Sequence, residues 1–98
     1  MVHVLVHHKI TDYNRWKMAF DSDLTARKRA GEIGFRVFYN AEDAHDIFLL
    51  SDWESADEAR NFMNSKELKD RMQQAGVQGA PEIRYLEDVR TVHRSAAD

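Results

Sequence analysis

Histidine is the residue type in this chain best suited to acid–base chemistry near neutral pH, and five histidines occur among its 98 residues. His3, His7 and His8 lie close together near the start. On an extended strand, His3 and His7 would share one side but lie ~13 Å apart, while His7 and His8 would point to opposite sides. Neither pair can chelate one ion, and no helical His-x-x-x-His pattern occurs. The sequence therefore predicts no structural metal.

His8 is the strongest candidate for a catalytic residue. It falls on the same side of the expected strand as Val4 and Val6, near the strand's end. With a pKa near neutrality, its imidazole could accept a proton from a phenol or an enol. The alternative is a histidine hydrogen-bonded at the edge of the core, which suits the intermediate burial of this residue type.

Further side chains could contact a flat, apolar ligand, although core packing is the competing use for each. Tyr39 and Trp53 are candidates for groups that orient such a ligand, whereas Phe62 and Met72 could form a deformable wall. Charged residues on the expected strands could face either a pocket or a dimer interface; these are Arg36, Asp52 and Arg84.

Strands and helices that alternate along the chain must position these residues. Apolar β-branched residues at period two predict a strand, and apolar residues three or four apart behind Thr11-Asp12 predict a capped helix. The expected order is a strand at 2–10, a helix ending at Gly31 or Gly34, a hairpin of strands at 35–40 and 47–53, a helix from Ser55 that restarts at Ser65, and a strand at 83–92.

This β-α-β-β-α-β order predicts an α+β, ferredoxin-like fold: a four-stranded antiparallel sheet with helices on one face. The first strand (Val4 and Val6 against Leu5) and the third (47–50) are apolar on both sides. A strand of this kind requires cover on both faces, and the helices supply only one. We therefore expect a homodimer through the open sheet face, forming a dimeric α/β barrel.

Composition indicates an ordinary globular domain, with 43% hydrophobic and 32% charged residues and a net charge of −3. The interspersed charges argue against nucleic acid as a partner, and no apolar run is long enough to span a membrane. We expect a single domain at 1–93, a frayed tail at 94–98, and a cytoplasmic protein. The chain has no cysteine, so it contains neither a disulfide nor a thiol nucleophile.

Several stretches carry a family resemblance: Val4 to Lys9 with Asp12-Tyr13 and Trp16; Gly34 to Phe38; Trp53-Glu54-Ser55 with Glu58-Ala59, Phe62 and Ser65; and Ala75-Gly76-Val77. With them the chain, from Val2 to about Val92, resembles the antibiotic biosynthesis monooxygenase-like members of the dimeric α/β-barrel superfamily. The resemblance implies a pocket between the sheet and the helices, into which the His8 side chain would point.

Families on this fold also include heme-degrading enzymes and polyketide cyclases. The heme-degrading pattern has an asparagine, a tryptophan and an iron-ligating histidine where this chain has His8, Phe62 and Met72, so none of the three matches. The cyclases often place a histidine in the second helical region, and 61–78 contains none.

Two functions remain. The resemblance implies a small, cofactor-independent monooxygenase acting on an aromatic or quinol-like substrate, with His8 as the base. The alternative is a dimeric small-molecule-binding or stress-associated protein without catalysis. A pocket with no polar group beyond His8 would favour binding, whereas a further donor beside it would favour the enzyme.

Overall fold

A four-stranded antiparallel sheet, in the strand order β2-β3-β1-β4, forms the centre of the computed structural model, which describes residues 1–94. The strands are β1 (Val2–Ile10), β2 (Glu32–Asn40), β3 (Asp43–Trp53) and β4 (Val77–Glu87). The helices are α1 (Tyr13–Ser22), α2 (Leu24–Ala30), α3 (Ala56–Met63) and α4 (Lys66–Gln74).

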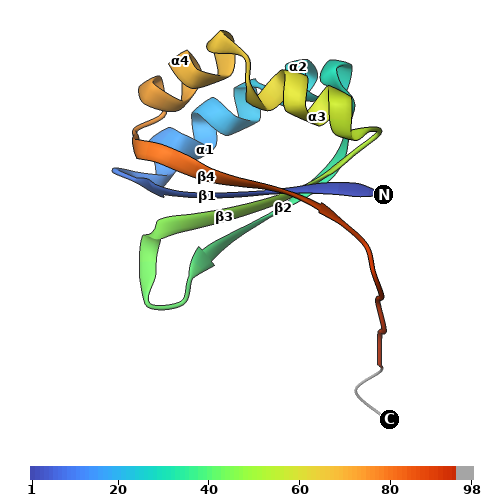
Figure 1. The fold of residues 1–98 in the computed structure, drawn as a ribbon. Coiled ribbons are helices and arrows are strands. Elements are labelled where there is room, and N and C mark those ends of the chain that lie inside the picture. Colours follow the sequence, from blue (N-terminus) through green and yellow to red (C-terminus); the bar gives the residue numbers. More distant parts are fainter. Residues whose placement is uncertain (95–98) are drawn as a thin grey trace.

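All four helices lie on one face of the sheet, and the other face is open (Figure 1). This arrangement confirms the predicted α+β, ferredoxin-like fold. The chain beyond β4 runs away from the sheet on the open side. Of the tail predicted at 94–98, only Arg94 belongs to the described residues, and 95–98 lie outside them.

β1 is the central strand that links the sheet to the core. It pairs with β3 along one edge and with β4 along the other. Its side chains therefore point alternately toward the helices and toward the open face of the sheet. Val4 and Val6 are fully buried under the helices, and Ile10 is 2% exposed. On the open face, His3, Leu5 and His7 of the other row are half-buried and Lys9 is exposed. The two-sided apolar pattern predicted from the sequence is therefore real.

The helix starts follow their sequence signals. Asp12 accepts a hydrogen bond from the backbone N–H of Arg15 at 3.1 Å, and Ser55 and Ser65 cap α3 and α4 in the same way. The single first helix predicted from the sequence is wrong, because it breaks at Asp23 into α1 and α2. Short polar residues such as Asp21, Ser22 and Asp23 compete with the helix backbone for hydrogen bonds, which favours a break.

Strand pairing moves several predicted boundaries. β2 begins at Glu32, which pairs with Trp53, and β3 begins before the predicted residue 47. β4 spans 77–87 instead of 83–92, because Val77 pairs with Ile10 and Glu87 pairs with Val2. Residues after 87 have no β1 residue left to pair with.

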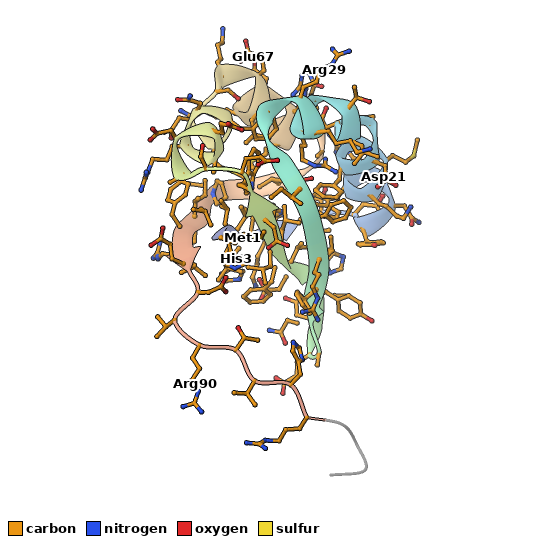
Figure 2. All side chains as sticks on the ribbon, turned by 90° about the vertical axis from the view of Figure 1, so that its right-hand side faces the viewer. Met1, His3, Asp21, Arg29, Glu67 and Arg90 are labelled. Carbon is orange, nitrogen blue, oxygen red and sulfur yellow. The ribbon has the colours of Figure 1, made fainter. Side chains whose placement is uncertain are left out.

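Charged side chains cover the outside of the helical layer, where Asp21, Arg29 and Glu67 project from the molecule (Figure 2). None of the helices within residues 1–94 is long and apolar enough to cross a membrane.

Gly31 joins α2 to β2 in a backbone conformation that suits glycine. Its φ is +117°, and the first group that a Cβ would meet is the carboxylate end of the exposed Glu58 side chain, which can rotate away. We expect Gly31→Ala to lower the free energy of unfolding by about 2 kcal/mol, chiefly from backbone strain. The matched control is Gly79→Ala, at φ +69° with open space around it, which should cost about 1 kcal/mol. Chemical denaturation measures both, and equal losses would contradict the greater strain at Gly31.

Candidate active site

A small cavity lies between the sheet and the helices. Its volume is about 60 Å³, and its accessible wall is almost entirely apolar. The lining comes from β1, β2, β3, β4, all four helices and the turns between them; it comprises Val6, His8, Trp16, Ala19, Phe20, Asp23, Arg27, Glu32, Leu49, Phe62, Met63, Leu68, Arg71, Met72, Ala75 and Val77.

His8 is the polar residue that β1 places in this cavity wall. It lies in the buried row of β1 and is 6% exposed, and its ring lies 5.8 Å from the ring of Trp16. Among residues 1–94, no side chain or backbone group forms a hydrogen bond with either ring nitrogen. The hydrogen bond expected in the alternative is therefore not supplied by any protein group among these residues.

Burial controls the charge of His8. The pKa of the His8 imidazole is lowered from 6.5 to about 4, mainly by loss of solvation and in smaller part by nearby His7, while Asp46 partly opposes the shift. The imidazole is therefore neutral at physiological pH. A neutral imidazole keeps one ring nitrogen free to accept a proton, which is the state that a general base requires.

A β-bulge stands opposite His8. The pairing of β1 with β4 shifts between His7 and Lys9, and β4 has the three residues 79–81 beside the single His8. Bulges of this kind occur often next to active sites, where they redirect the chain. The same residues line an open groove of about 370 Å³ that adjoins the cavity, and Met63, Leu68, Met72 and Val77 border both.

An aromatic series runs along one wall of the cavity. Trp16 stacks on Phe20 with ring centroids 4.9 Å apart, and the guanidinium carbon of Arg27 lies 3.7 Å above the ring of Phe20. Contacts thus run in sequence from His8 through Trp16 and Phe20 to Arg27. Phe20 is thus packed between the Trp16 ring and the Arg27 guanidinium, so the series forms a closely packed wall of the cavity.

A buried ion pair lies at the Arg27 end of this series. Arg27 donates from Nε to Glu32 Oε1 at 3.1 Å and from Nη1 to the carbonyl oxygen of Phe20 at 2.5 Å. Burial raises the pKa of the Glu32 carboxyl, and the Arg27 charge offsets part of that rise. A second pair, Arg71 Nε with Asp23 Oδ1 at 3.2 Å, is more exposed and connects α4 to the start of α2.

The structure brings some of the predicted site residues together and leaves others apart. Phe62 and Met72 line the cavity with His8. Tyr39 shares a cross-strand row with His8, but Ile47 lies between them and Tyr39 is 61% exposed. Trp53 is buried in the core outside the cavity lining, where its Nε1 donates to Ser51 Oγ at 2.8 Å.

The remaining candidates lie on the open face. His3 contacts Asp52 at 2.5 Å and Asp88 at 2.8 Å, and these carboxylates raise the pKa of the His3 imidazole. Strand register places Arg36 and Arg84 in the same row as Leu5, so both face the open side instead of the cavity. Within residues 1–94, no group of three or more potential ligands could hold a metal ion.

Sequence reasoning missed the polar residues at the far end of the cavity from His8. Arg27 belongs to the run Ala26 to Arg29, which resembles a solvated helix face, and Glu32 lies in a segment that was expected to be the end of a helix. Helical spacing is the signal that could have identified Arg27, because it lies seven residues after Phe20 and eleven after Trp16 and so continues their face of the helix. Its positive charge favoured a solvated position instead, although the side chain is buried.

Solved structures of other proteins share this fold, although sequence comparisons find no match. No family model matches the sequence, and no curated protein matches it at a significant level. Among solved structures, a protein from Bordetella bronchiseptica provisionally assigned as an antibiotic biosynthesis monooxygenase is 15% identical, with a TM-score of 0.75 over 91% of this chain and 97% of that one.

Two further solved structures have the same fold. SnoaB, a cofactor-independent oxygenase from Streptomyces nogalater, is 10% identical, with a TM-score of 0.75 over 95% of this chain and 97% of its own. A protein from Caulobacter crescentus CB15, also provisionally assigned as an antibiotic biosynthesis monooxygenase, is 20% identical, with a TM-score of 0.67 over 91% of this chain and 90% of its own. This chain therefore has the fold of the antibiotic biosynthesis monooxygenases, as its sequence predicted.

The burial of His8 generates a pH-dependent prediction. Between pH 6.5 and about 4 the unfolded chain binds a proton at this position and the folded protein does not. The contribution of His8 to stability is therefore complete above pH 6.5 and falls by about 3 kcal/mol as the pH drops to about 4. His8→Leu should remove this acid sensitivity and, at pH 7, raise the free energy of unfolding by about 1 kcal/mol, because an unpartnered polar group is lost.

Urea unfolding of the wild type and of His8→Leu at a series of pH values measures the difference. His45→Gln is the matched control, since the His45 side chain is 61% exposed. A His8→Leu variant with the same acid sensitivity as the wild type would show that His8 is not desolvated.

Proposed function

We propose that this protein is a cofactor-independent monooxygenase that oxidises a small aromatic or quinol-like substrate in the cavity between sheet and helices, with His8 as the general base. The observation that carries the proposal is a neutral, buried imidazole without a hydrogen-bond partner among residues 1–94, in the wall of an apolar cavity. The likeness to SnoaB, itself a cofactor-independent oxygenase, supports the same class of reaction.

The chemistry needs few protein groups. An electron-rich substrate that loses a proton to His8 becomes a carbanion or phenolate, which can reduce O₂ itself. With a dihydroxynaphthalene, the products would be a hydroxynaphthoquinone and water, each containing one atom of O₂. The negative charge formed on the substrate stabilises the imidazolium, which offsets the low pKa that burial gives His8. An apolar wall excludes water from the anion.

The substrate must displace side chains to bind. A cavity of about 60 Å³ is smaller than the ~150 Å³ cavity that holds benzene in an engineered protein. Met72 separates the cavity from the adjoining groove, and its unbranched thioether side chain can change rotamer at low cost. Movement of Met72 would join the two spaces beside His8, and Phe62 could stay as the opposing wall.

Arg27 and Glu32 also border the cavity, but their unpaired atoms are buried and they lie away from His8. They do not supply the donor beside His8 that would distinguish an enzyme from a binding protein. The enzyme is proposed because of the unpartnered His8 imidazole and the likeness to SnoaB.

The catalytic assignment predicts the behaviour of His8→Ala. Incorporation of ¹⁸O₂ into 1,4-dihydroxynaphthalene should fall by ~10²-fold, the usual scale for a lost general base, and the deficit should shrink at high pH where the substrate ionises unaided. The wild-type kcat/KM should stay level from pH 8 down to about 5, because the pKa of His8 in the free protein is about 4. A folded His8→Ala protein with unchanged turnover would sink the assignment, and His45→Ala provides the control.

We also propose that two copies associate through their open sheet faces. This face, defined here by its apolar residues Leu5, Phe38, Phe48, Leu50 and Leu86, has no helices over it. Phe38 and Leu86 are each 41% exposed, and Val89 beyond β4 is 99% exposed. Leu5, Leu50 and Phe48 form an apolar centre on this face, with Arg36 and Arg84 at either side of it in the same row. A second sheet would cover that centre.

Leu50→Lys should convert the dimer into a monomer, because it places a charge at the centre of the open face, opposite Leu5 and Arg36. Light scattering at micromolar concentration measures the mass. The matched control is Glu67→Lys, on the outside of the helical layer, which should remain dimeric. A monomeric wild type at this concentration would refute the proposed interface.

A further inference from the structure

Helix α4 closes one side of the cavity with few of its residues. Leu68 is the buried residue of this nine-residue helix, Arg71 and Met72 are half-buried, and the remaining six are exposed. These three side chains border the cavity from α4, while Trp16 and Phe20 border it from α1. The cavity therefore lies between α1 and α4, over the sheet.

A second space lies on the other side of α4. The open groove of about 370 Å³ is bounded by α4 and by residues of β4 between Val77 and Ile83, and Leu68 and Met72 border both the groove and the cavity. A helix with space on two sides has few packing partners, and elements of this kind move at low cost in free energy. A shift of α4 toward β4 would enlarge the cavity and narrow the groove.

Two polar contacts hold α4 against α1. Arg71 Nε lies 3.2 Å from Asp23 Oδ1, directly after the end of α1, and Arg15 Nε donates to the carbonyl oxygen of Gln74 at 2.7 Å. The α1 part of the cavity wall lies between Arg15 and Asp23 in the chain, so the two contacts flank it. Arg15 is exposed and the Arg71 side chain is 39% exposed, so water can replace either contact.

Both ends of α4 are junctions that stay attached when the helix moves. Ser65 precedes the helix, and its backbone N–H donates to the carbonyl oxygen of Phe62 in α3 at 3.1 Å. Gly76 follows the helix with a φ of +84°, and its carbonyl oxygen accepts from the N–H of Thr11 at 3.0 Å. These bonds lie outside α4, so the helix can shift as one body between them.

We propose that α4 is a lid over the cavity, which opens toward β4 when the contacts of Arg71 with Asp23 and of Arg15 with Gln74 are released. The motion belongs to the ligand-free protein, so this inference goes beyond the proposed function. It also supplies the space that a cavity of about 60 Å³ lacks for an aromatic substrate. Met72 moves with the helix.

Access of a small quencher to Trp16 measures the opening. Trp16 is 4% exposed in the cavity wall, whereas Trp53 is 1% exposed and lies outside the cavity lining. In a Trp53→Phe background, acrylamide should quench Trp16 about fivefold faster in the double variant Arg15→Met with Arg71→Met than in its parent, because two weak polar contacts that favour the closed state are lost. Arg71→Met alone should give a smaller increase.

The matched control is Lys17→Met, which removes the exposed pair of Lys17 Nζ with Asp21 Oδ2 at 2.9 Å within α1 and should leave the quenching unchanged. In a Trp16→Phe background, Trp53 should be quenched equally with and without the two arginine substitutions. Should Trp53→Phe disturb the core, 5-fluorotryptophan in the chain with both tryptophans gives the same comparison, since a soluble nitroxide broadens the fluorine signal of the more accessible ring.

Unchanged quenching of Trp16 in the folded double variant, or an equal rise for Trp16 and Trp53, would overturn the lid. Neither measurement uses a ligand, so each result tests the lid separately from the proposed function, which the oxidation assay tests.

Discussion

The position of β1 between two neighbouring strands is the constraint on which the rest of the structure depends. Its side chains can face only the helices or the open side, so Val4, Val6, His8 and Ile10 form one row. Three of these residues form the core, and the fourth is brought into it by the same alternation. The cavity, the low pKa of His8 and the apolar open face all follow from this strand.

The polar groups at the cavity conflict with the stability of a small domain. A chain of 98 residues has little apolar surface to bury, yet it encloses an unpartnered imidazole and a half-formed ion pair. Proteins commonly break local rules of stability where function requires it. The unpartnered imidazole lies in the wall of the cavity, where the proposed function uses it as a base.

Most of the fold could be predicted from sequence because its signals are local. The period-two alternation of apolar residues predicted β1 with its correct ends, and the capping residues Asp12, Ser55 and Ser65 predicted three helix starts. The ends of β4 depend on pairing with β1, which no local pattern contains. Phe62 and Met72 were predicted at the cavity, but Arg27 was not, since a charged side chain is expected on the solvated face even where helical spacing aligns it with Trp16 and Phe20.

The central claim, that His8 is a desolvated base in a ligand cavity, is tested most directly by NMR titration of the histidine rings. His8→Gln would assign the His8 signals. The His8 ring of the free protein should stay neutral down to about pH 4, and at pH 7 its nitrogen shifts should respond to anaerobic 1,4-dihydroxynaphthalene. A His8 ring that titrates near pH 6.5 and is unaffected by the ligand would contradict this claim.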